Sequence, residues 1–161
     1  MTNQAVSWLT NHEIEAVIER FADRSTREAF LGIFPLDTLP PRVEQRPAFL
    51  IVNTQTADLP GRHWLCLLLM DNEYGEVFNS VGVPPPPAIA RWMSEMVDVW
   101  TYNDKTYQLP GTATCGAFCV YVILHRLQYP SLSRTLRTFT TSLSVNDCLI
   151  THYYRIIKQA M

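Results

Sequence analysis

Hydrophobic residues near the start of the chain recur at the spacing of a helix. The residues on this apolar face are Ile14, Val17, Ile18 and Phe21. Their spacing predicts a helix over residues 11–30, with Asn11 as its N-cap. The proline-rich segment 31–47 that follows predicts an irregular loop.

Three short apolar runs in the middle of the chain have the composition of buried strands. They cover residues 48–54, 63–70 and 76–79. The polar sequence DNEYG separates the last two, so residues 63–79 are predicted to form a β-hairpin. The prolines of VGVPPPP then end the third strand, because proline lacks the N–H that a strand ladder needs.

The second half of the chain predicts three helices and one strand. The helices are expected at residues 88–99, 115–128 and 147–159, and the strand at 100–108. Either Ser144 or Asn146 is the expected N-cap of the last helix. Because helices and strands segregate more than they alternate, we expect an α+β fold with a central mixed or antiparallel sheet packed by helices.

Composition and charge fit a single domain over residues 1–161. Hydrophobic residues make up 47% and charged residues 17% of the chain, which is enough apolar material for a core. The net charge of -2 gives no general attraction to nucleic acid or to an anionic membrane. The arginines at positions 126, 134 and 137 are expected on a solvated surface.

Cysteine usage and hydropathy indicate the cellular compartment and the kinds of site to expect. No apolar run is long enough to span a membrane, and the first residues do not resemble a signal peptide. The four cysteines form no disulfide framework and, with four scattered histidines, no zinc pattern. We therefore expect reduced thiols in an intracellular compartment, without a metal or cofactor. Cys66, Cys119 and Cys148 are expected to be core residues.

Cys115 has the sequence context of an activated nucleophile. It stands between a Gly/Thr loop and the predicted helix 115–128, whose positive end favours a thiolate. Gly116 leaves room for a substrate backbone to approach. The alternative is that Cys115 is a small core residue, as a lone free cysteine usually is.

His63 and Asn79 stand at strand ends of the predicted hairpin. His63 can take the proton of a thiol and form a thiolate–imidazolium pair near neutral pH. Asn79 can accept a hydrogen bond from the imidazole and hold the ring in one tautomer. The alternatives are a surface histidine at a loop end and an asparagine that starts a turn.

Gln108 lies seven residues before Cys115, across a Pro-Gly loop. If the loop folds back, the Gln108 amide and the Cys115 backbone N–H can donate to a developing oxyanion. The alternative is an exposed polar residue that closes a strand. Each assignment is weak alone, and the joint order His–Asn–Gln–Cys is what supports them.

Several segments together resemble the adenovirus protease (adenain) family and, more distantly, the SENP-type deconjugating peptidases of the papain-like clan. The similar segments are FLGIF (30–34), AFLIVNT (48–54), GRHWLCLLLM (61–70), VFNSVG (77–82) and QLPGTATCGAFC (108–119). They cover roughly residues 30–125 and follow the order of the family.

The resemblance implies a papain-like thiol protease that cleaves viral precursor proteins after glycine, often Gly-Gly, during virion maturation in the host nucleus and the virion. It implies that Cys115 attacks, His63 transfers the proton, Asn79 orients His63, and Gln108 holds the oxyanion. Trp64 would shield the histidine from water, or it is a plain core aromatic.

Two departures from the family pattern limit what the resemblance implies. The family usually has Asp or Glu at the place of Asn79, and Asn cannot neutralise an imidazolium. Asp71 is a weaker candidate, since the hairpin should carry it away from His63. The best-known members use a disulfide-linked activating peptide and DNA, but no cysteine lies between positions 66 and 115 here. We expect protein substrates as partners and leave an activating peptide open.

Two other functions remain open from the sequence. A deconjugase that removes ubiquitin-like proteins at a Gly-Gly terminus would use the same residues, but it needs an exosite for which the short chain offers little surface. An inactive relative kept as a binding module is suggested only by Asn79, and the complete His, Gln and Cys set argues against it.

Overall fold

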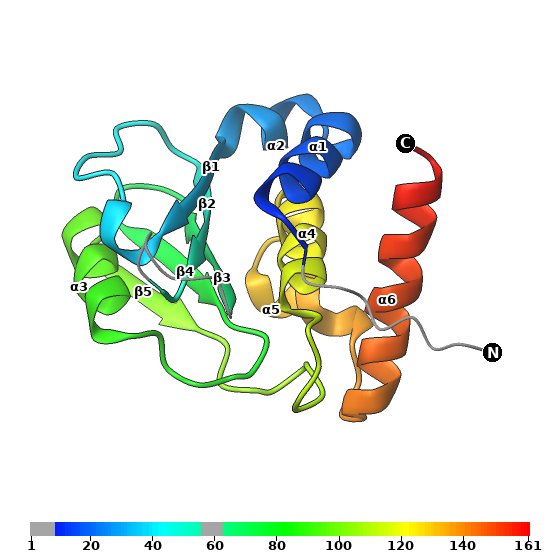
Figure 1. Ribbon diagram of the computed structural model, residues 1–161. Coiled ribbons are helices and arrows are strands. Elements are labelled where there is room, and N and C mark those ends of the chain that lie inside the picture. The colour runs from blue at the N-terminus through cyan, green and yellow to red at the C-terminus, as the bar shows by residue number, and fades with distance from the viewer. Residues whose placement is uncertain (1–8, 56–62) are drawn as a thin grey trace.

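A five-stranded mixed sheet forms the centre of the computed structural model, which describes residues 9–55 and 63–161 (Figure 1). The strands, in spatial order, are β1 (Phe30–Pro35), β2 (Ala48–Asn53), β3 (Trp64–Leu69), β4 (Tyr74–Phe78) and β5 (Val99–Tyr102). β3 is antiparallel to both β2 and β4, whereas the edge strands β1 and β5 run parallel to their neighbours. The predicted α+β fold and the 63–79 hairpin are confirmed.

Helices cover both faces of the sheet (Figure 1). They are α1 (Asn11–Phe21), α2 (Arg24–Ala29), α3 (Pro87–Met96), α4 (Cys115–His125), α5 (Leu132–Thr135) and α6 (Leu143–Gln159), with 3₁₀ turns at Leu36–Thr38, Arg126–Gln128 and Leu136–Thr138. α3 packs on one face, and α1, α4 and α6 lie on the other. α4 is buried from Cys115 to Leu124, which explains why its sequence is apolar all round.

The two covered faces explain the continuous apolar runs of the central strands. Phe49 and Ile51 of β2 point into the core that contains α4, and the alternate residues Leu50 and Val52 point into the core that contains α3. A strand that is buried on both sides needs no polar face. The hydrophobic pattern therefore located β2 and β3 to within a residue or two.

The first third of the chain differs from the prediction. The helix expected at 11–30 is two helices, and α1 is capped by Thr10, in a reciprocal capping box with Glu13, rather than by Asn11. A second cap, Asp23, starts α2. Residues 30–35, expected as part of a helix and a loop, form the edge strand β1, whose half-exposed residues give it little of the pattern of a buried strand.

Two element boundaries in the second half of the chain also differ from the prediction. The strand expected at 100–108 ends at Tyr102, because the Asn103 side chain turns back to bond the backbone of Asn79. The last helix begins at Leu143 with Ser142 as its N-cap, so neither Ser144 nor Asn146 caps it.

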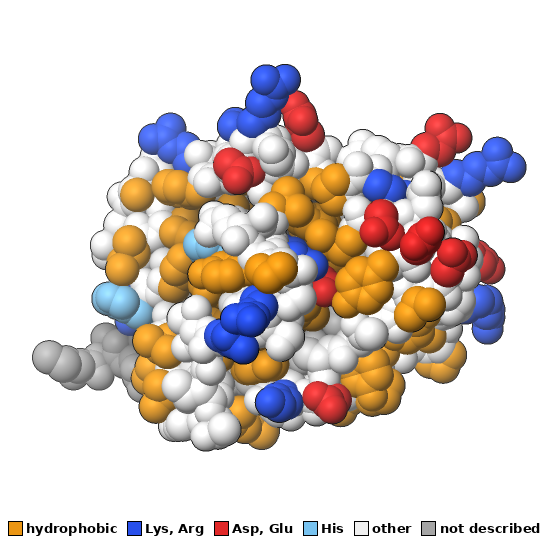
Figure 2. Space-filling view, turned by 180° about the vertical axis from the view of Figure 1, so that it is seen from behind, with side chains coloured by type: hydrophobic (Ala, Val, Ile, Leu, Met, Phe, Trp, Pro, Cys, Tyr) orange, Lys and Arg blue, Asp and Glu red, His pale blue; other side chains and the backbone are white. Residues whose placement is uncertain are grey.

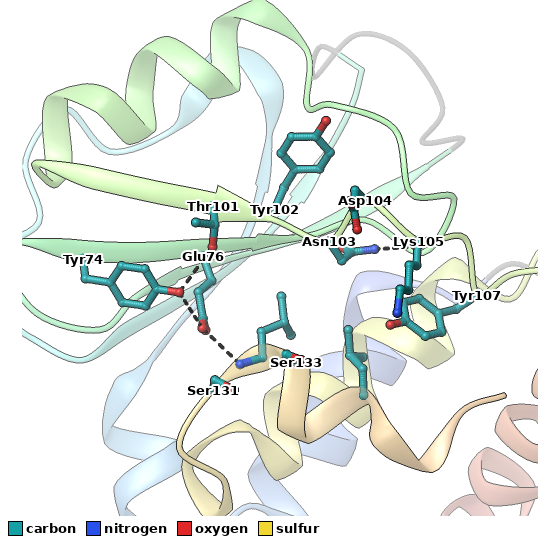
Figure 3. Close-up of a pocket in the computed structure, with 12 residues that line it drawn as sticks. Tyr74, Glu76, Thr101, Tyr102, Asn103, Asp104, Lys105, Tyr107, Ser131 and Ser133 are labelled. Atoms are coloured by element: carbon teal, nitrogen blue, oxygen red, sulfur yellow. Dashed lines mark hydrogen bonds between the residues drawn. The ribbon is translucent and has the colours of Figure 1, made fainter. Parts of the chain in front are cut away.

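Arg126 was expected on the solvated surface, but it is buried in an ion pair. Its Nε lies 2.6 Å from Oε2 of Glu76, and the two side chains are 3% and 1% exposed. Oε1 of Glu76 accepts from the backbone N–H of Leu132 at 3.0 Å and from the Tyr74 hydroxyl, which Figure 3 shows directed at the carboxylate. This buried ion pair joins the middle of β4 to the end of α4.

The state of the cysteines and the hydropathy of the helices can also be set against the expectations from the sequence. All four cysteines are free; Cys66, Cys115 and Cys119 are buried, but Cys148 is exposed and the prediction for it was wrong. In residues 9–55 and 63–161, no helix has the length and apolar character needed to cross a membrane. The same residues contain no group of three His, Cys, Asp or Glu side chains placed to hold a metal.

Candidate active site

His63 and Asn79 meet at one end of the β3–β4 hairpin. Nε2 of His63 lies 2.8 Å from Oδ1 of Asn79. Oδ1 also accepts from the Val81 N–H at 3.2 Å, and Nδ2 donates to the Val83 carbonyl at 2.9 Å, so the amide oxygen is the atom that faces the ring. The proton is thereby assigned to Nε2, and Nδ1 keeps its lone pair for use as a base.

The backbone around this pair is held on both sides. The Thr54 N–H donates to the His63 carbonyl at 2.9 Å and extends the β2–β3 ladder to the histidine. Asn103 bonds both backbone groups of Asn79, accepting from its N–H at 2.7 Å and donating to its carbonyl at 2.6 Å. The Asn79 backbone is therefore fixed by Asn103, and its side chain is held between His63 and the turn residues Val81 and Val83.

Gly82 closes the turn that follows Asn79. It has a φ of +71°, and its N–H donates to the Asn79 carbonyl at 2.9 Å. A Cβ at this position would lie 2.6 Å from the backbone of Lys105 and Thr106. Only glycine lets the turn pack this closely against the segment that leads to Gln108.

Cys115 is the first residue of α4, as predicted, and is 2% exposed. Backbone N–H groups of Trp64, Gly116 and Cys115 itself act on the sulfur and lower its pKa. Because Trp64 follows His63 directly, this contact places the thiol against the start of the histidine strand. Burial is the larger effect, however, and it raises the pKa of Cys115 to about 11.

Burial thus shifts both Cys115 and His63 toward their neutral forms, which disfavours the thiolate–imidazolium state considered from the sequence. Burial lowers the pKa of His63, and the hydrogen bond to Asn79 offsets only part of that effect. At neutral pH, the site holds a protonated thiol and an imidazole with a free lone pair. This state suits general-base catalysis, in which the proton moves during the attack.

Gln108 is buried against Ser80, which follows Asn79, rather than exposed at a strand end. Its Oε1 accepts from the Ser80 hydroxyl at 2.6 Å, and its backbone N–H donates to the Ser80 carbonyl at 3.0 Å. Its Nε2 donates to the Thr112 carbonyl at 2.8 Å. The amide that was considered as an oxyanion donor is therefore bonded to Thr112 within the same loop.

Asp71, Gly116 and Trp64, which the sequence also singled out, have the surroundings of residues that support the fold. Asp71 lies in the β3–β4 turn, at the hairpin end away from His63, where its carboxylate accepts from two backbone N–H groups. The space above Gly116 is filled by Leu9, 3.3 Å from where a Cβ would lie, so it does not leave room for a substrate. Trp64 is a buried core aromatic.

The sequence interpretation missed Ser80, Asn103 and Asp147, which hold the predicted residues in place. Asp147 accepts hydrogen bonds from Leu109 and Thr114, on either side of the loop before Cys115. A signal for it was available, because Asp147 falls at helical spacing with the buried residues Ile150 and Tyr154. A carboxylate on an apolar helix face needs hydrogen-bond donors.

A polar cavity of about 320 Å³ lies beside β5 and is separate from Cys115 and His63 (Figure 3). Asn103, Lys105 and Tyr107 line it on one side, and residues around α5 line it on the other. Asn103 connects the cavity wall to the Asn79 backbone.

On the face shown in Figure 2, the Lys and Arg side chains are scattered among hydrophobic and acidic ones.

Comparison with known proteins supports the fold. No family model and no curated protein sequence matches the chain. The crystal structure of the ASFV pS273R protease matches with a TM-score of 0.58 and 20% identity, over 83% of this chain and 62% of that one. Its selenomethionine form matches with a TM-score of 0.55 and 20% identity, over 83% and 63%. The chain spans less than two thirds of these proteins and shares the fold of the ASFV pS273R protease.

Proposed function

We propose that this chain is a cysteine endopeptidase that acts in viral maturation. The observation that carries the proposal is the 2.8 Å bond between His63 Nε2 and Asn79 Oδ1, with Cys115 starting a helix against the Trp64 amide. The likeness to the ASFV pS273R protease supports protein substrates. Precursor proteins of a virus and cleavage after glycine come from the sequence resemblance to adenovirus protease.

Acylation begins with the neutral pair. As the Cys115 sulfur attacks the scissile carbonyl carbon, Nδ1 of His63 takes the thiol proton and a C–S bond forms. The carbonyl oxygen becomes an oxyanion. The C–N bond then breaks, and His63 gives its proton to the leaving amine. Asn79 keeps Nε2–H in place throughout, so that Nδ1 remains the nitrogen available to take the proton.

Deacylation reverses these roles. Water attacks the thioester carbonyl while His63 takes one of its protons. The C–S bond breaks, the product leaves as a carboxylic acid, and His63 returns the proton to sulfur. Asn79 cannot share the positive charge that His63 carries between the steps, so the proton must be passed on quickly.

The oxyanion is stabilised by groups at and before the start of α4. The Cys115 N–H lies at the positive end of α4, where negative charge is favoured. Gln108 is the second donor in this proposal, and it acts once its Nε2 leaves the Thr112 carbonyl to which it donates at 2.8 Å. A substrate carbonyl competes for the same donor.

The test is peptide cleavage by the wild type and by Cys115→Ala. Fluorogenic peptides with an internal Gly-Gly bond report the expected specificity, and a mixed peptide library analysed by mass spectrometry reports cleavage at any other bond. Cys148→Ala is the matched control because it removes an exposed thiol. The wild type and the control should cleave, and Cys115→Ala should not. Equal cleavage by all three would remove Cys115 from the reaction.

A further inference from the structure

Asp147 is a carboxylate with little access to solvent. It lies in the first turns of α6 and is 8% exposed. Burying a charged carboxylate costs free energy unless hydrogen-bond donors surround it. Its donors therefore show which part of the structure it stabilises.

Both ends of the nucleophile loop, defined as residues 108–114, bond to this one carboxylate. The Leu109 N–H donates to Oδ1 at 3.0 Å. The Thr114 hydroxyl lies 3.2 Å from Oδ1 and 3.2 Å from Oδ2. Asp147 thus fixes the residue that follows Gln108 and the residue that precedes Cys115.

The bond to Thr114 also changes the start of α4. A threonine at the N-cap usually accepts from an N–H of the first turn. Thr114 occupies that position with a helical φ of -93° and ψ of -1° and makes no such bond; its hydroxyl lies against the Asp147 carboxylate and 3.1 Å from the Thr112 hydroxyl. The Thr114 side chain therefore caps none of the first-turn N–H groups, which include those that act on the Cys115 sulfur.

The neighbouring Asn146 holds the chain just before the loop. Its Nδ2 donates to the Tyr107 carbonyl at 3.2 Å and to the Thr140 carbonyl at 2.8 Å, and its Oδ1 accepts from the Thr140 N–H at 2.7 Å. This anchor leaves the nucleophile loop between two fixed points. Asp147 is the group that acts on the loop itself.

We propose that Asp147 is a positioning residue that clamps the nucleophile loop and keeps the Thr114 hydroxyl off the N-terminus of α4. This inference rests on the proposed peptidase function. It predicts that loss of the clamp lowers kcat rather than substrate affinity, because the displaced groups serve the transition state.

The experiment uses Asp147→Asn, Thr114→Val and the double variant in the full chain. Asp147→Asn should lower kcat about 30-fold, Thr114→Val about 10-fold, and KM should stay within about twofold. The double variant should be no worse than about 30-fold, since both changes break one interaction. Thr114→Ser keeps the hydroxyl and should stay within about twofold of the wild type, as should the exposed control Asp98→Asn.

Hydrogen exchange gives a readout that needs no catalysis. Without the clamp, amides of residues 108–114 should exchange about tenfold faster, while those of β3 stay protected. Unchanged exchange would overturn the clamp, and so would multiplied kcat losses of about 300-fold in the double variant. If Asp147→Asn does not fold, Thr114→Val decides alone, and near-normal kcat rejects the idea. A wild type that cleaves no peptide sinks the proposed function, and exchange still decides the clamp.

Discussion

The candidate site has two arms that the fold builds in different ways. The strand arm, His63 and Asn79, comes from two adjacent strands of one hairpin and is fixed by ladder bonds and by Asn103. The helix arm, Gln108 to Cys115, is a loop followed by a helix start, and its contacts come from Ser80 and Asp147. Hairpin register fixes the first arm locally, whereas the second depends on residues far away in the sequence.

The largest effect should come from the strand arm. His63→Ala removes the proposed base for the thiol proton, and kcat/KM should fall about 10³-fold or more. His152→Ala, an exposed histidine of α6, is the control and should keep full activity. Steady-state kinetics with a fluorogenic peptide gives both values. A loss below tenfold for His63→Ala would show that another group takes the proton.

Breaking the buried ion pair that joins β4 to the end of α4 should lower the stability of the fold that carries both arms. Arg126→Met leaves the Glu76 carboxylate buried without its cation and should lower the free energy of unfolding by about 3–4 kcal/mol. The change is measured by urea titration, with the exposed Arg137→Met as the control. Adding Glu76→Gln should restore part of the loss. An equal effect of the two arginine variants would mean that the pair is not what joins β4 to α4.

In the helix arm, the Cys115 thiol should react unusually slowly with alkylating reagents in the resting protein. With the pKa of Cys115 raised to about 11 from 9.0, its thiolate fraction below pH 9 is about 100-fold smaller than that of an unperturbed thiol. Iodoacetamide labelling of Cys115 should therefore rise about tenfold per pH unit between pH 8 and 10. The exposed Cys148 is the internal reference in the same mass spectra. A labelling rate that is already at its plateau at pH 6 would instead indicate a resting ion pair.

A smaller effect is expected at the turn where the arms touch. Gly82→Ala puts a Cβ against the Lys105 backbone at a positive φ and should cost about 1–3 kcal/mol of stability. Gly111→Ala is the informative control, because its φ of +79° carries the same strain but nothing lies within 4 Å of the added Cβ. Thermal unfolding of both variants separates the clash from the backbone strain. Equal losses would assign the whole effect to φ.

The difference between the arms also explains what the sequence could reveal. Apolar runs with a turn between them predicted the β3–β4 hairpin, and with it the closeness of His63 and Asn79. The start of α4 at Cys115 followed from its apolar run. These features depend on neighbours within about 20 residues, the range over which periodicity is informative.

Contacts between distant segments could not be read in the same way. The bond of Ser80 to Gln108, the burial of Arg126 against Glu76 and the clamp by Asp147 all depend on how layers pack. The neutral state of Cys115 depends on burial, which outweighs the helix end that the sequence does reveal. The edge strand β1 was missed because its residues are half exposed and rich in loop formers.

The position of Asp147 in the chain has a consequence for synthesis on the ribosome. His63 and Asn79 leave the ribosome early and can pair as soon as the hairpin forms, but the carboxylate that bonds Leu109 and Thr114 is translated more than 30 residues after Cys115. A nascent chain can therefore carry His63 and Cys115 before the nucleophile loop is closed. The order of translation delays closure of this loop until α6 has been made.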